Sequence, residues 1–136
     1  MTEGVDVRAS AVPEEITIEL AADTSLGLTA RVLIAAAARH FGLDDGSVED
    51  LRLAVSELFS SGVEADGGPV RIGVGRVEGD VVLRVSGTGS LDPDSSLERP
   101  GGSLAARADL LRALFPTARF TPDAGGTTVI TVPIES

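Results

Sequence analysis

The chain has 136 residues, the length of one domain, and 43% of them are hydrophobic and 24% charged, which is a globular composition. It contains no cysteine and one histidine, His40, which excludes disulfides, thiolate metal sites and histidine-rich catalytic groups. The net charge is −10, all eleven basic residues are arginine, and the only aromatic residues are four Phe. Such a chain is unsuited to binding a phosphate backbone or stacking on bases, so we expect no nucleic-acid partner.

No stretch of the sequence approaches the ~18 apolar residues of a membrane span, so we expect no membrane partner. The N-terminus lacks a basic region followed by an apolar one, so no signal peptide is predicted and we expect a cytoplasmic protein. Residues 1–13 are predicted to form a flexible arm, and residues 14–136 a single domain.

The first half of the domain contains one predicted strand and two predicted helices. Alternating apolar residues predict a strand over 16–20, and helical spacing then predicts a helix over 26–41 that ends at Gly42. A second helix is predicted to open at Ser47, with Asp50 completing a capping box, and to end within 65–68. In this helix one apolar face is formed by Val48, Leu51, Val55, Leu58 and Gly62.

The second half begins with two strands, over 70–75 and 81–86, joined by a turn at Glu78-Gly79. A long loop over 86–102 leads to a third helix from Ser103 to Phe115, and strands over 117–122 and 127–134 complete the domain. This order of elements predicts an α+β fold. We expect a two-layer α/β sandwich, with a mixed, mostly antiparallel sheet and the helices on one face.

The predicted second helix carries the most informative segment, LRLAVSELFSSGVEA at residues 51–65. Taken alone, Glu57 in this segment is what a solvated position of any helix would hold. The segment resembles, however, the N-box of the histidine-kinase-like ATPase superfamily, and more narrowly that of the anti-sigma-factor serine kinases of bacteria. The resemblance implies a histidine-kinase-like ATPase fold with Glu57 as the general base. Ser61 stands where the family has a magnesium-binding Asn.

A second segment, VVLRVSGTGSLDP at residues 81–93, is similar to the family's Asp-x-Gly-x-Gly motif, in which the Asp reads the adenine amino group. Two alignments remain open. One places Ser86 at the Asp position and the other, anchored on Gly87 and Gly89, places Val85 there, and neither supplies a carboxylate. The simpler alternative is an ordinary turn after a strand.

Two further segments resemble the parts of the family's site that face the phosphates. Gly101, Gly102, Ser103 and Leu104 stand where the family has Gly-x-Gly-Leu at a helix N-terminus, and Thr127 stands where it has a hydroxyl near the phosphates. Both segments are also compatible with a glycine-rich helix start and a hairpin turn. The resemblance therefore implies a nucleotide-binding set of Ser61, Ser86, Gly87, Gly89, Gly101, Gly102, Ser103, Leu104 and Thr127, without a metal site of the protein's own.

The replaced Asn, Asp and glycine indicate that ATP binding is weakened or lost, so no cofactor is expected unless the site still binds Mg-ATP. We therefore predict an anti-sigma-factor-like regulatory protein that acts by protein–protein binding. Its expected partners are a sigma factor and/or an anti-sigma-factor antagonist, and the resemblance implies a homodimer. The alternative is an active ATP-dependent serine-protein kinase that phosphorylates the antagonist with Glu57 as base. A third possibility is a domain that serves an unrelated partner on the same fold.

Overall fold

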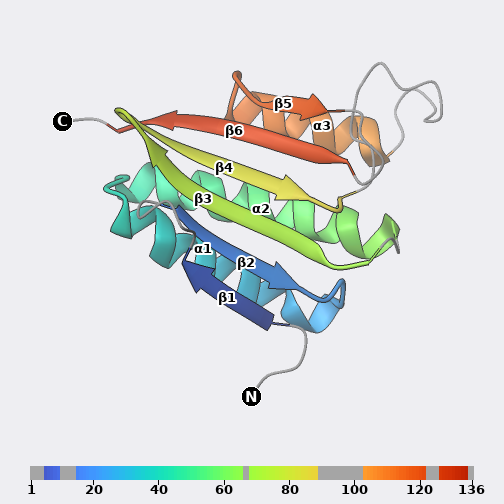
Figure 1. The fold of residues 1–136 in the computed structure, drawn as a ribbon. Helices are drawn as coiled ribbons and strands as arrows, with labels where there is room; N and C mark the ends of the chain where they lie inside the picture. The colour runs from blue at the N-terminus through green and yellow to red at the C-terminus, as the bar shows by residue number, and fades with distance from the viewer. Residues whose placement is uncertain (1–4, 10–14, 66–67, 89–102, 122–125, 135–136) are drawn as a thin grey trace.

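A computed structural model describes residues 5–9, 15–65, 68–88, 103–121 and 126–134. In these residues the elements follow the order of Figure 1: β1 (Val5–Ala9), β2 (Glu15–Leu20), η1 (Thr24–Leu26), α1 (Gly27–His40), α2 (Asp45–Ala65), β3 (Val70–Val77), β4 (Asp80–Ser86), α3 (Ser103–Leu114), β5 (Arg119–Thr121) and β6 (Thr127–Pro133). The chain thus has an α+β fold, as the order of predicted elements indicated.

The six strands form one sheet in the order β1-β2-β3-β4-β6-β5, and every pairing in it is antiparallel. The predicted mixture of parallel and antiparallel strands is therefore wrong for the described residues. Within the predicted N-terminal arm, residues 5–9 form the edge strand β1, which pairs with β2 so that Val7 lies opposite Ile18. The prediction of an arm is wrong for these five residues, because backbone hydrogen bonds to β2 order them.

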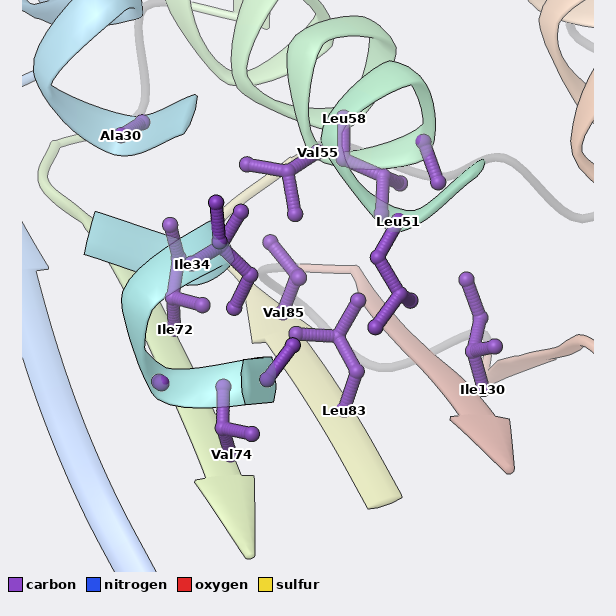
Figure 2. Packing of buried hydrophobic residues seen from close by; sticks show 14 of the residues in the cluster. Ala30, Ile34, Leu51, Val55, Leu58, Ile72, Val74, Leu83, Val85 and Ile130 are labelled. Carbon is purple, nitrogen blue, oxygen red and sulfur yellow. The ribbon is translucent and has the colours of Figure 1, made fainter. Parts of the chain in front are cut away.

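All three helices lie on the same side of the sheet (Figure 1), so the fold is a two-layer sandwich. On the helix side of the sheet every second residue is fully buried over 70–74 of β3 and 81–85 of β4, as the period of a strand requires. Figure 2 shows Leu51 and Val55 of α2 pointing toward Leu83 and Val85 of β4. Each large apolar side chain buried in this way stabilises the fold by roughly 1.5–3 kcal/mol.

The start of α2 differs from the prediction. The chain leaves α1 at Gly42, whose φ of +100° favours glycine and confirms the predicted stop. The side chain of Asp44 then accepts a hydrogen bond of 2.7 Å from the backbone N–H of Ser47, so Asp44 is the N-cap and Asp45 the first helical residue. The predicted capping box of Ser47 and Asp50 is therefore wrong.

The periodicity of α2 is confirmed, because Val48, Leu51, Val55 and Leu58 are fully buried and Gly62 is buried beside them. This face fixes the rotation of α2 and so decides where its polar residues point. Among the helices of the described residues, none combines the length and apolar character needed to cross a bilayer.

Candidate functional site

Glu57 lies on α2 between its buried and exposed faces, with a side chain that is 31% exposed. Its carboxylate accepts a hydrogen bond from the Nε of Arg107 on α3, at 3.3 Å. The same guanidinium donates through Nη2 to Glu64, seven residues further along α2. Arg107 therefore joins two carboxylates of α2 to α3, and the residue that resembles the general base is already engaged by the chain's own cation.

The charges of this Glu57–Arg107–Glu64 bridge influence one another. The hydrogen bond from Arg107 holds the pKa of the Glu64 carboxyl below its ordinary value. The pKa of Arg107 is raised, chiefly by its hydrogen bond to Glu64, against an opposing effect of burial. The Arg107 side chain is only 15% exposed, and its guanidinium stays protonated. The cation beside Glu57 is therefore permanent.

Ser61 lies one helical turn after Glu57 and is 2% exposed. Its hydroxyl donates a hydrogen bond of 2.7 Å to the backbone carbonyl of Thr88, in the segment that follows β4. A hydroxyl can donate only one proton, and here that proton is used within the chain. Ser61 thus ties α2 to the end of β4.

Backbone packing brings α2 and the end of β4 unusually close. A Cβ on Gly62 would lie far inside contact distance of Val70 Cγ2 and 3.1 Å from the carbonyl oxygen of Gly87. Gly87 itself has a φ of +87°, and a Cβ on it would lie 2.5 Å from the carbonyl oxygen of Pro69. These two glycines are required by the close approach, which leaves no room for a larger side chain between α2, β3 and β4.

Ser86 and Thr127 lie opposite one another on β4 and β6, and their hydroxyls are 3.4 Å apart. Both belong to the alternate set of residues that faces away from the helices, whereas Val85 is fully buried on the helix side. The structure therefore brings Ser86 together with Thr127 but not with Glu57 or Ser61. Of the two alignments of this motif, the one with Val85 at the Asp position is the one that places a side chain toward α2.

The other predicted site residues stand between β4 and the start of α3 in the sequence. Gly89, Gly101 and Gly102 lie outside the described residues. Ser103 and Leu104 are the first two residues of α3, in agreement with the predicted start of this helix. The bridge at Arg107 is therefore close in sequence to that start, on the second turn of α3.

Sequence reasoning missed Arg107 and Glu64 because neither carries a local signal. Arg107 is 50 residues from Glu57 and 43 from Glu64, so only the packing of α3 beside α2 reveals the bridge. The sequence does show that Glu57 and Glu64 are two turns apart and share one face of α2. This spacing indicates an ion-paired cluster only when the cation between them is known.

Two hollows lie in the part of the chain that the structure describes. One is a groove of about 490 Å³ between the start of α1 and the second half of α2, lined in part by Arg31, Phe59 and Glu64, so it adjoins the bridge. The other, of about 290 Å³, lies on the open face of the sheet above Gly73 and Gly75. Within the described residues, no group of three or more His, Cys, Asp and Glu side chains is arranged to hold a metal ion.

A comparison with models of known protein families finds no match to this chain, and a comparison with curated proteins finds none either.

Proposed function

We propose that the chain is a regulatory protein that acts by binding other proteins, on a scaffold of the histidine-kinase-like ATPase type. The role we propose is that of an anti-sigma factor, with a sigma factor and/or an anti-sigma-factor antagonist as partner. The observation that carries the non-catalytic part of this proposal is that two polar residues of α2 already have partners within the chain. Arg107 pairs with Glu57, and the backbone carbonyl of Thr88 accepts a hydrogen bond from the buried Ser61 hydroxyl.

A base that abstracts a proton must be free to approach it, and a magnesium ligand must turn an oxygen lone pair toward the metal. In this chain the Glu57 carboxylate is shared with a guanidinium, and the Ser61 hydroxyl is buried against a backbone carbonyl. The apolar Val85 at the adenine-reading position removes a charged hydrogen bond, which is a loss on the order of 1.5–3 kcal/mol, or roughly ten- to hundredfold in affinity. These three features together support a protein that keeps the fold but does not catalyse phosphoryl transfer from ATP.

The surface of α1 supports protein partners. Leu28 and Val32 lie one turn apart on α1 and are 59% and 55% exposed, which gives this helix an uncovered apolar patch. Helix α1 lies behind β1 and β2 in the view of Figure 1. A second copy pairing through β1 and α1 would cover the patch, in line with the proposed homodimer. The net charge of −10 would favour approach to the basic surfaces of a sigma factor.

Calorimetric titration with Mg-ATP tests the loss of nucleotide binding. We expect no heat of binding up to millimolar nucleotide, whereas binding in the micromolar range would support the kinase instead. The partner is tested by co-purification of the tagged chain from its native host. Recovery of a sigma factor or an antagonist is expected, and repeated recovery of neither would contradict the anti-sigma role.

The homodimer is tested with Leu28→Glu and Val32→Glu, measured by light scattering coupled to size-exclusion chromatography. A charge on this patch would be buried in the proposed dimer, so we expect the dimer of the unmodified chain to become a monomer. Val77→Glu is the matched control, because Val77 is 58% exposed but lies at the end of β3. A monomeric unmodified chain, or a dimer that survives both Leu28→Glu and Val32→Glu, would contradict pairing through α1.

A further inference from the structure

Arg107 is the only described cation that contacts both Glu57 and Glu64, and it reaches them from a different helix. We infer that Arg107 is a latch: its ion pairs close off the Glu57 carboxylate and hold the beginning of α3 against α2. In this arrangement the availability of Glu57 and the position of α3 change together. The inference rests on the bridge itself and not on the identity of a sigma factor or a nucleotide.

The latch consists of two ion pairs that share one guanidinium. Glu57 and Glu64 are seven residues apart, which places them on the same face of α2 two turns from each other. Arg107 donates through Nε to Glu57 and through Nη2 to Glu64, so each carboxylate has its own donor on the same planar guanidinium. Moving Arg107 away therefore breaks both contacts, and Glu57 cannot be released while the guanidinium stays in place.

The two carboxylates differ in their access to solvent. Glu64 is 57% exposed and accepts the hydrogen bond that contributes most to the raised pKa of Arg107, whereas Glu57 is 31% exposed and lies 3.3 Å from Nε. Glu64 therefore anchors the guanidinium, and Glu57 is held by a cation that Glu64 keeps in position. We expect removal of the Glu64 charge to loosen the latch even though Glu57 is untouched.

The rest of α3 is held by contacts of another kind. Ala108 and Leu111 of α3 and Phe115, directly after it, are buried, so the later part of α3 is held by the apolar core. Arg107 precedes these residues and is held by ionic contacts. Apolar burial and ion pairs respond differently to competing ions, so the latch can open while the later turns of α3 remain packed. The Nη1 of Arg107 is buried and has no hydrogen-bond partner among the described residues, which leaves the guanidinium incompletely satisfied in the latched state.

Carboxyl footprinting of the full chain tests the latch. A carbodiimide and glycine ethyl ester label accessible carboxylates, and mass spectrometry reports the labelling rate of each one. With Arg107→Met we expect the rate at Glu57 to rise several-fold, together with faster hydrogen exchange at the first amides of α3. With Glu64→Gln we expect a smaller rise at Glu57. The matched control is Arg52→Met, which breaks the exposed pair of Arg52 and Glu49 and should leave Glu57 unchanged.

Unchanged labelling of Glu57 in both Arg107→Met and Glu64→Gln would overturn the inference. If Arg107→Met unfolds the chain, its circular dichroism will show it, and the milder Glu64→Gln then decides the outcome alone. Faster exchange throughout β3 and β4 would indicate general destabilisation and would also contradict a local latch. These results are independent of the Mg-ATP titration. The footprinting can therefore contradict the latch while the proposed function stands, and the titration can contradict the proposed function while the latch stands.

Discussion

Replacing Gly62 with Ala tests how tightly α2 packs on the sheet. The added methyl group would collide with Val70 Cγ2 and press on the carbonyl oxygen of Gly87 at 3.1 Å. Neither neighbour can give way easily, because Val70 is fully buried with a stiff β-branched side chain and the carbonyl belongs to the backbone. The substitution therefore forces α2 and the start of β3 apart.

Two opposing effects set the size of the change. Alanine in place of glycine in a helix interior stabilises by about 1 kcal/mol. Overpacking a filled core costs typically about 1–3 kcal/mol, and the depth of this collision puts Gly62→Ala at or above the upper end. We expect the free energy of unfolding to fall by about 2 kcal/mol, the difference between a steric cost of about 3 and a helix gain of about 1.

Urea denaturation followed by circular dichroism measures this change. Gly46→Ala is the control, because Gly46 is on the same helix and its Cβ would meet nothing nearer than Asp44 Oδ1 at 3.7 Å, so no loss is expected there. In a double-mutant cycle, Val70→Ala should relieve the collision and give a favourable coupling of about 1 kcal/mol with Gly62→Ala. A rise of about 1 kcal/mol for Gly62→Ala alone would refute the reasoning, since it would mean that only helix propensity acts.

Two other predictions concern the ends of α2. Ser61→Ala removes the hydrogen bond from the buried Ser61 hydroxyl to the carbonyl of Thr88, so we expect the free energy of unfolding in urea denaturation to fall by about 0.5–1.5 kcal/mol, against almost no loss for Ser60→Ala at a half-buried position. The backbone hydrogen bond from Ser47 lowers the pKa of Asp44 from its ordinary 3.8, so its contribution to stability is complete above that value and is lost as the pH falls through the lowered pKa. Thermal unfolding across this acid range should be less pH-dependent in Asp44→Asn, and an unchanged pH profile would contradict the cap.

Several parts of the fold could be predicted because they depend on local chemistry. The spacing of Leu51, Val55 and Leu58 identified the buried face of α2, and these side chains are fully buried. The turn at Glu78-Gly79 was visible from its residue types, and Glu78 indeed has a φ of 56°. Apolar periodicity reports which side of an element faces the core without knowledge of its partners.

Apart from the helix cap at Asp44, the errors concern features that depend on a partner. Residues 5–9 show the alternation of a strand, but such a short segment is ordered only by its pairing with β2. The orientation of Ser86 follows from strand register, and only the pairing with Thr127 shows that it points away from α2. The similarity of the sequence motif could not decide between Ser86 and Val85. The two are neighbours in a strand and therefore face opposite sides of the sheet.

The sequence by itself determined the α+β class, most of the elements and the face that each of them buries. It also placed Glu57 and Ser61 on one side of α2, because four residues make about one helical turn. Only the tertiary structure decided what these side chains do. Their partners, Arg107 and Thr88, are 50 and 27 residues away, and an ion pair or hydrogen bond depends on distance in space, which the packing of α3 and β4 against α2 creates.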